Sequence, residues 1–193
     1  DQFWFAGQNT TTVLYCDDGE TWQLSGAELK AQTPSIGVYG AVEPVIVELS
    51  HGKLWMLART QLGRFYESLS DDGVSWSPLQ PSPLINSDSP AGLARLSDGR
   101  LVLLWNKCLR FPYAHGGRHV LHAAVSEDDG RSWIGHREVA RDPRRYLPPP
   151  PAGDHGTAYP FPVALPDDTV LVTTGQGGGC VVVVAIDPEW LYE

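Results

Sequence analysis

Cysteines, long helices and long hydrophobic runs are scarce in this sequence, and each scarcity excludes a class of protein. The three cysteines, Cys16, Cys108 and Cys180, include no CxxC pair, so they indicate neither a disulfide framework nor a zinc site. No run approaches membrane-spanning length and no signal peptide is visible, so the sequence indicates no compartment. The only helical candidate is the short segment 26–32.

Basic residues are also few. Acidic residues outnumber Lys and Arg by 23 to 14, and the formal net charge is −9. This balance argues against a nucleic-acid partner, because phosphate backbones are bound by basic surfaces. The chain is instead rich in turn-forming residues, with 20 glycines and 16 prolines, which suit many short strands joined by turns.

One short motif occurs three times: CDDGETW at 16–22, SDDGVSW at 70–76 and SEDDGRSW at 126–133. In each copy an Asp side chain can accept hydrogen bonds from the turn's own N–H groups, and the glycine can adopt a positive φ. A Ser or Thr precedes a Trp, which we expect to pack between neighbouring sheets. Three unrelated hairpins would not share that Trp, and the Asp-x-Asp-x-Asp-Gly spacing of a calcium loop is missing.

The spacing of the motif predicts a repeat architecture. Gly19 and Gly73 are 54 residues apart, and Gly73 and Gly130 are 57 residues apart. A fixed period of about 50 residues in a β-rich sequence indicates propeller blades, each a four-stranded antiparallel meander. The chain is long enough for about three and a half such blades.

The motif resembles the Asp box of the sialidase, or neuraminidase, superfamily of BNR repeat proteins. In that family the box closes the turn between the third and fourth strands of a blade. The resemblance covers most of the chain and corresponds to the C-terminal part of the propeller. It implies an all-β, sialidase-like β-propeller, six-bladed in the family, of which residues 1–193 form a single partial domain.

The expected strands follow the repeat. They lie at 2–6 and 11–15 in the first blade, at 43–49, 54–60 and 64–69 in the second, at 91–96, 101–106 and 118–125 in the third, and at 170–174 and 181–186 in the last, which begins at Tyr159. The segments 107–117 and 140–158 are long for connections, and the prolines at 148–151 indicate a shaped rim rather than a floppy tail.

A four-stranded meander sorts its strand ends onto two faces, and the boxes all lie on one of them. Glu43 and Tyr159 begin first strands, Arg59 ends a second strand and Arg118 begins a third, so all four belong to the opposite face. The upper loops of the same face carry further candidates for lining a pocket, and these are Asn86, Asn106 and Arg110. We therefore expect side chains from three blades to converge on one rim, away from the boxes.

Three segments on that face resemble the site segments of sialidases. GAVEP at 40–44 with Arg59 is similar to the segments of the catalytic Glu and the second arginine, RHVL at 118–121 to that of the third arginine, and AYP at 158–160 to that of the catalytic Tyr. The resemblance implies that Tyr159 is the nucleophile and Glu43 its base. It also implies that Arg59 and Arg118 bind the substrate carboxylate. The family's first arginine and its Asp acid would lie upstream of this sequence.

The chemistry of sialic acid suits these residue types. Its carboxylate fits the planar, bidentate fork of a guanidinium group. A neutral phenol approaches an anomeric carbon beside that carboxylate with less repulsion than a carboxylate nucleophile, and sialidases are known for a Tyr nucleophile. A phenol with a pKa of about 10 needs a base.

Each residue also has an ordinary structural explanation. Glu43 beside Pro44 could cap a turn, Arg59 and Arg118 could be surface charges, and Tyr159 could be an interfacial aromatic. Tyr146 competes for the role of nucleophile, although it lies inside the proline segment rather than at the start of a strand.

The function expected from these residues is that of an exo-acting, retaining, sialidase-like glycoside hydrolase. It would release terminal sialic acid or a related acidic sugar without a metal or other cofactor, and its partner would be a glycan or small sugar. The alternatives are a non-catalytic glycan-binding propeller and a hydrolase for another sugar. The start at Asp1, without Met and in mid-blade, favours a fragment whose N-terminal half, or a second chain, completes the propeller. We expect this chain alone to be inactive.

Overall fold

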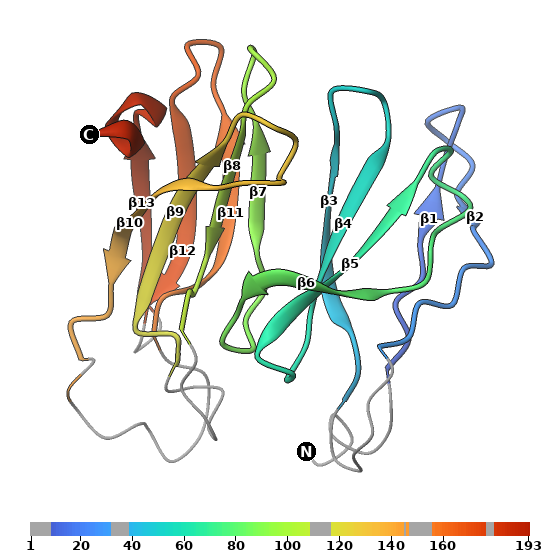
Figure 1. Cartoon of the computed structure of the whole chain (residues 1–193), viewed down its shortest axis with the longest axis horizontal. Coiled ribbons are helices and arrows are strands. Elements are labelled where there is room, and N and C mark those ends of the chain that lie inside the picture. Colours follow the sequence, from blue (N-terminus) through green and yellow to red (C-terminus); the bar gives the residue numbers. More distant parts are fainter. Residues whose placement is uncertain (1–8, 32–38, 109–116, 145, 147–155, 177–179) are drawn as a thin grey trace. The chain divides into compact units, whose positions relative to one another are not determined.

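The computed structural model describes residues 9–31, 39–108, 117–144, 146, 156–176 and 180–193 (Figure 1). This part of the chain consists of antiparallel β-strands, with a 3₁₀-helix, η3 (Pro188–Tyr192), near the C-terminus. The chain divides into two compact units, residues 1–84 and 85–193, and each is described by itself. None of the helices in the described ranges is long and apolar enough to cross a membrane.

The first unit contains a hairpin and a four-stranded sheet. Strands β1 (Leu14–Tyr15) and β2 (Gln23–Leu24) form the hairpin, and the sheet follows the order β3 (Val42–Glu48), β4 (Leu54–Arg59), β5 (Arg64–Ser70) and β6 (Gln80–Ile85). Strand β4 is buried on both faces from Trp55 onward, as its continuous apolar sequence requires. Its Met56 and Ala58 form a core with Leu29, Ala31 and Leu79.

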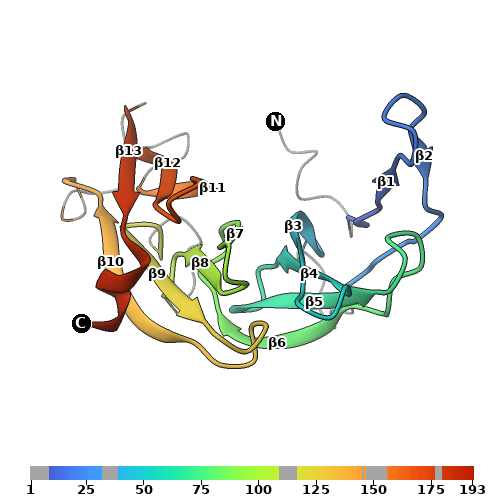
Figure 2. The same cartoon turned by 90° about the horizontal axis from the view of Figure 1, so that it is seen from above.

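The second unit contains a four-stranded and a three-stranded sheet. The first has the order β7 (Gly92–Arg95), β8 (Leu101–Trp105), β9 (Val120–Ser126) and β10 (Ile134–Arg141), and the second has the order β11 (Ala158–Ala164), β12 (Val170–Gln176) and β13 (Cys180–Ile186). Helix η3 is capped by Asp187, which accepts a hydrogen bond from the Glu189 N–H, and it lies against β9 and β10 (Figure 2).

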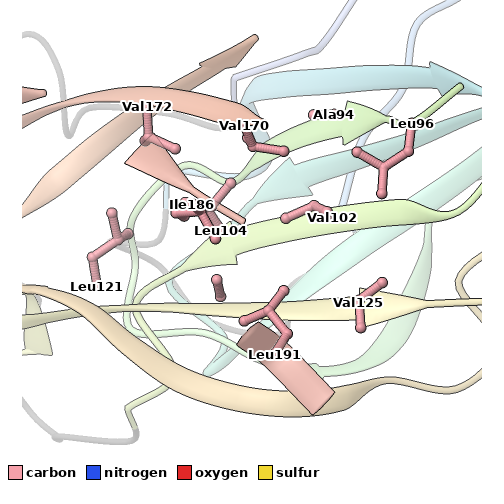
Figure 3. Close-up of a cluster of buried hydrophobic side chains, with 11 residues drawn as sticks. Ala94, Leu96, Val102, Leu104, Leu121, Val125, Val170, Val172, Ile186 and Leu191 are labelled. Atoms are coloured by element: carbon pink, nitrogen blue, oxygen red, sulfur yellow. The ribbon is translucent and has the colours of Figure 1, made fainter. Parts of the chain in front are cut away.

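The core of the second unit lies between its two sheets. Alternate residues of β7, β8 and β9 face alternate residues of β12, with Leu191 of η3 closing one side (Figure 3). The buried members of this cluster are Ala94, Leu96, Val102, Leu104, Leu121, Ala123, Val125, Val170, Val172, Ile186 and Leu191. Sheets that pack face to face in this way hold the strand ends, where the predicted site residues lie, in fixed positions.

The sheets confirm the all-β fold and the predicted number of blades: two complete meanders, a three-stranded blade and a two-stranded end. The expected helix at 26–32 is wrong for the part that the structure describes. Leu29 exchanges two backbone hydrogen bonds with Thr11, both with N–O distances of 2.9 Å, so this segment is extended. The pairing outweighs its weak local helical preference. The strand expected at 2–6 lies outside the described residues.

The Asp boxes have the hydrogen bonds that their sequence predicts. Asp72 Oδ1 accepts from the backbone N–H groups of Val74 and Ser75, at 2.9 and 2.6 Å. The indole N–H of Trp76 donates to the Gly73 carbonyl oxygen at 3.0 Å. The backbone N–H groups of Ser75 and, to a smaller extent, Val74 stabilise the charged carboxylate, and they lower the pKa of Asp72 to about 2. The carboxylate is therefore part of the turn.

The three box tryptophans differ in burial, which the motif alone did not predict. Trp76 packs against the core of the first unit, and Trp133 is half-buried. Trp22 is 67% exposed, against the expectation that each Trp would pack between sheets. Its hairpin, β1–β2, has no third strand within the described ranges, so it offers no broad sheet face for the indole.

Candidate functional site

Glu43 and Tyr159 occupy the same strained position in two different blades. Each lies near the start of a first strand, directly before a proline, with a positive φ of 48° for Glu43 and 57° for Tyr159. The strand register shifts at both places, between Val42 and Val45 and between Ala158 and Phe161. A residue before proline normally has extended backbone, so this left-handed conformation carries strain. Such bulges redirect a side chain, and strain of this kind concentrates at functional sites.

In the first unit, Glu43 and Arg59 form an ion pair at the end of the sheet opposite the box. Arg59 ends β4 and pairs in register with Val42, so its side chain starts beside Glu43. The distance from Arg59 Nη1 to Glu43 Oε2 is 2.6 Å. Arg59 is 9% exposed, whereas the Glu43 side chain is 39% exposed. The ion pair therefore holds the buried Arg59 guanidinium in place, while the Glu43 carboxylate stays accessible to solvent.

An aromatic ring supports this ion pair. The guanidinium carbon of Arg59 lies 5.5 Å from the centroid of the Tyr39 ring. Tyr39 is itself held by its N–H group, which donates to Gln61 Oε1 at 3.3 Å. The carboxylate of Glu43 and the face of the Tyr39 ring together keep the plane of this guanidinium oriented.

In the second unit, Arg118 lies against Tyr159. Arg118 is 1% exposed, and its guanidinium carbon is 5.4 Å from the centroid of the Tyr159 ring. Its Nη2 donates to the carbonyl oxygen of Asp88 at 2.9 Å. Asp88 also has a positive φ, of 58°, which helps to direct this carbonyl group. The phenol and the cation are thus held together by groups from separate strands and loops.

The backbone of Arg118 is bonded to the segment that leads into β11. The N–H of Thr157 donates to the Arg118 carbonyl oxygen at 2.5 Å. Gly156 has a φ of 92°, and a Cβ there would lie 2.2 Å from the same oxygen, so no larger residue fits without movement. This close approach fixes the distance between Arg118 and the strand of Tyr159.

The two predicted asparagines are fully buried and bond to the protein itself. Asn86 closes its own loop, with Nδ2 donating to the Ser89 carbonyl oxygen at 2.9 Å. Asn106 donates to the carbonyl oxygens of Val120 and Thr157, at 2.8 and 2.6 Å. That either residue contacts substrate stays a prediction.

Two further candidates have different outcomes. Arg110 lies outside the described residues. Tyr146, the competing nucleophile, is 84% exposed. Because Glu43 and Arg59 belong to the first unit and Arg118 and Tyr159 to the second, the convergence of all four on one rim also stays a prediction.

Sequence reasoning missed several residues around these pairs. Asp88 acts through its carbonyl group and Thr157 through its N–H, and any residue type carries these groups. Asp142 is 1% exposed, and its Oδ2 lies 3.9 Å from His119 Nδ1, next to Arg118 in sequence. The polar run before β7 was the only signal that could have indicated Asp88.

The antiparallel sheets and the repeated boxes together define a class of protein, the sialidase-like β-propeller. Residues 6–172 match the family model described as the BNR repeat-like domain, and the chain belongs to this family. No curated protein matches the chain by sequence.

Several solved sialidase structures are similar to the chain in fold. The sialidase of Trypanosoma rangeli has a TM-score of 0.61 and 19% identity over 95% of this chain and 28% of its own. The intramolecular trans-sialidase of Ruminococcus gnavus has a TM-score of 0.63 and 18% identity over 92% of this chain and 38% of its own. NanB sialidase of Streptococcus pneumoniae has a TM-score of 0.61 and 21% identity over 92% of this chain and 26% of its own.

The chain thus spans between 26% and 38% of the length of these proteins. The T. rangeli enzyme has also been solved with sialic acid, and with 2,3-difluorosialic acid as a covalent intermediate.

Proposed function

We propose that this chain carries the nucleophile side of the active site of a retaining exo-sialidase-like glycoside hydrolase. The observation that carries the proposal is the contact between Tyr159 and Arg118. A phenol on a strained bulge lies against a buried guanidinium, 5.4 Å from ring centroid to guanidinium carbon. A buried cation beside a strained tyrosine suits recognition of an anionic sugar next to a nucleophile.

The proposed roles follow the chemistry of each group. Arg59 and Arg118 bind the sugar carboxylate, and the Tyr159 oxygen attacks the anomeric carbon as the bond to the leaving oxygen breaks. Glu43 takes the phenol proton, and the leaving oxygen takes a proton from an acid. Water then displaces Tyr159 from the sugar: the acid, deprotonated in the first step, takes a proton from this water, and Glu43 returns its proton to the phenol oxygen. Two displacements at one carbon give retention of configuration.

The acid and a further arginine are supplied, on this proposal, by polypeptide other than these 193 residues. The short coverage of the solved sialidases supports this view. A longer form of the protein, or a second chain, would complete the propeller and the site. The substrate is a glycan with terminal sialic acid or a related acidic sugar.

A reagent with a fluoride leaving group tests the nucleophile without the acid. Fluoride leaves without needing a proton, so 2,3-difluorosialic acid should label this chain: the Tyr159 oxygen bonds to the anomeric carbon, the C–F bond breaks and Glu43 takes the phenol proton. Intact-mass spectrometry should detect one added glycosyl group, and peptide mapping should locate it at Tyr159.

Two variants make the test specific. Tyr159→Phe should abolish labelling, whereas Tyr146→Phe, which removes the exposed competitor, should leave it unchanged. Labelling at Tyr146, or no labelling of the wild-type chain, would contradict the proposed nucleophile.

A second candidate function is a glycan-binding propeller without catalysis. It is favoured by the lack, in this sequence, of residues corresponding to the acid and first arginine of sialidases. Two results together would favour the binding function: the completed protein binds a sialoside saturably without cleaving it, and Arg118→Ala abolishes this binding. Cleavage of the sialoside by the completed protein would exclude a purely binding function. If the natural substrate is a different sugar, a panel of glycosides would identify it.

A further inference from the structure

Asn106 lies at the centre of the hydrogen bonds behind Arg118 and Tyr159. It follows β8 directly, and its side chain is 0% exposed. Both hydrogens of its amide group are used: Nδ2 lies 2.8 Å from the Val120 carbonyl oxygen and 2.6 Å from that of Thr157. One side chain therefore joins the start of β9 to the segment that leads into β11.

The orientation of this amide follows from its partners. Carbonyl oxygens only accept hydrogen bonds, so the NH₂ end must face them, and the reversed amide would place three oxygens together. Asn106 Oδ1 is buried, and it has no hydrogen-bond partner in the part of the chain that the structure describes. A buried acceptor of this kind costs free energy, which a fold without a specific need for the two donors would avoid.

The two carbonyl groups that Asn106 joins stand next to the proposed reacting groups. Val120 is two residues after Arg118, and Thr157 is two residues before Tyr159. The same Thr157 donates its N–H to the Arg118 carbonyl oxygen. The hydrogen bonds from Asn106 and Thr157 thus connect the start of β9, which follows Arg118, to the segment that leads into Tyr159.

Asn106 is itself held from the other side. Its carbonyl oxygen accepts the Ser87 hydroxyl at 3.3 Å, and the same hydroxyl lies 2.9 Å from the Gly117 carbonyl oxygen. Ser87 precedes Asp88, whose carbonyl oxygen accepts a hydrogen bond from the Arg118 guanidinium. These bonds hold the backbone of Asn106, from which the side-chain amide extends.

We propose that Asn106 is a positioning residue, whose amide holds the Arg118 guanidinium and the Tyr159 ring in register by bonding the backbones that carry them. Its role in the reaction rests on the proposed function, but its role in the register does not. This differs from the substrate contact that its sequence position suggests, because both donors are already used within the protein.

Ser126 provides a control in the same unit. It is 1% exposed, and it lies at the box end of β9, whereas Val120 begins that strand. Its hydroxyl donates to Asp128 Oδ1 at 2.9 Å and accepts from the Gly130 N–H at 2.8 Å. Ser126→Ala therefore removes a buried hydrogen-bonding group without touching the link between the start of β9 and the segment before β11.

The first measurement is hydrogen exchange of the Thr157 amide in the whole chain, and it requires no activity. In Asn106→Leu this amide should exchange at least about tenfold faster, relative to core amides of β8, because its segment has lost its tether. Ser126→Ala should leave the ratio unchanged. Equal effects in both variants, or no change in Asn106→Leu, would overturn the proposal. If Asn106→Leu does not fold, Asn106→Ser, which adds no bulk and can bond only one carbonyl group, takes its place.

The second measurement is the labelling rate with 2,3-difluorosialic acid. Asn106→Leu should lower the rate at saturation by about 100-fold, with a smaller change in the half-saturating concentration, since misplaced reacting atoms mainly slow the chemical step. Ser126→Ala should label at the wild-type rate, because Ser126 lies in the box at the opposite end of β9. Wild-type labelling that is unaffected in Asn106→Leu would remove the positioning role in the reaction. If the wild-type chain is not labelled at all, the proposed function fails, and hydrogen exchange alone decides the role of Asn106.

Discussion

The Arg118 guanidinium lies over the face of the Tyr159 ring while one of its nitrogens donates to the carbonyl oxygen of Asp88. The carbonyl bond fixes one edge of the guanidinium plane, and the ring fixes its tilt. A planar guanidinium matches a carboxylate with two parallel N–H donors, whereas a lysine ammonium is a point charge without that fork.

We therefore expect Arg118→Lys to weaken binding of sialic acid by at least about tenfold, although the charge is kept. Titration calorimetry on the whole chain measures this affinity directly. Arg137→Lys is the control, because Arg137 also lies over a ring, with its guanidinium carbon 4.9 Å from the Trp190 centroid. An equal loss of affinity in both variants would mean that Arg118 has no special part in binding the carboxylate.

The close approach of Gly156 to Arg118 predicts a large cost for a single methyl group. Gly156→Ala combines left-handed backbone with a contact of 2.2 Å to the Arg118 carbonyl oxygen, so it should destabilise the second unit by about 3 kcal/mol or more. Gly99→Ala has a similar φ of 94° but only a flexible arginine end at 3.8 Å, so it should cost only about 1 kcal/mol. Urea unfolding compares the two, and similar midpoints would contradict the predicted crowding.

The box tryptophans predict unequal losses of stability. Trp76→Ala removes a side chain that packs on the core of the first unit, so it should cost about 3 kcal/mol. Trp22→Ala removes an indole that is 67% exposed and should cost less than about 1 kcal/mol. Thermal unfolding of the two variants measures the difference. Equal losses would show that Trp22 is buried in solution.

The box carboxylates predict acid sensitivity. The Ser132 hydroxyl and backbone N–H lower the pKa of Asp128 to about 2, below that of the unfolded chain. A lowered pKa in the folded state means stability that is fully present above about pH 4 and is lost as the pH falls towards about 2. Asp128→Asn should flatten the dependence of the free energy of unfolding on pH in this window. Urea unfolding of the wild-type chain and of this variant between about pH 2 and pH 5 measures the two slopes, and equal slopes would contradict the prediction.

The sequence was sufficient for the fold because the fold depends on local signals that repeat. Each box forms its turn from its own residues, as Asp72 and Asp128 illustrate, so three copies at a nearly constant spacing predicted the blades. The extended segment around Leu29 was missed because it depends on Thr11, a partner 18 residues away. Trp22 was missed because burial depends on neighbouring sheets rather than on the motif.

For the candidate site, the sequence supplied residue types but not backbone geometry. Glu43 and Tyr159 could be proposed because their segments, 40–44 and 158–160, resemble sialidase segments and lie at strand starts. Their positive φ could not be predicted, because residues before proline favour extended conformations. The carbonyl oxygen of Asp88 and the N–H of Thr157 could not be predicted either, since every non-proline residue has both groups.

The strained bulge before proline has a consequence for how such a site can change. Two blades provide the same backbone shape at the same place, and one holds an acid, Glu43, while the other holds a phenol, Tyr159. The shape recurs in these two blades without fixing the side chain that it carries. Under the proposed roles, one bulge presents a base and the other a nucleophile, so we expect a substitution at such a bulge to change the group presented while the strand pairing stays the same.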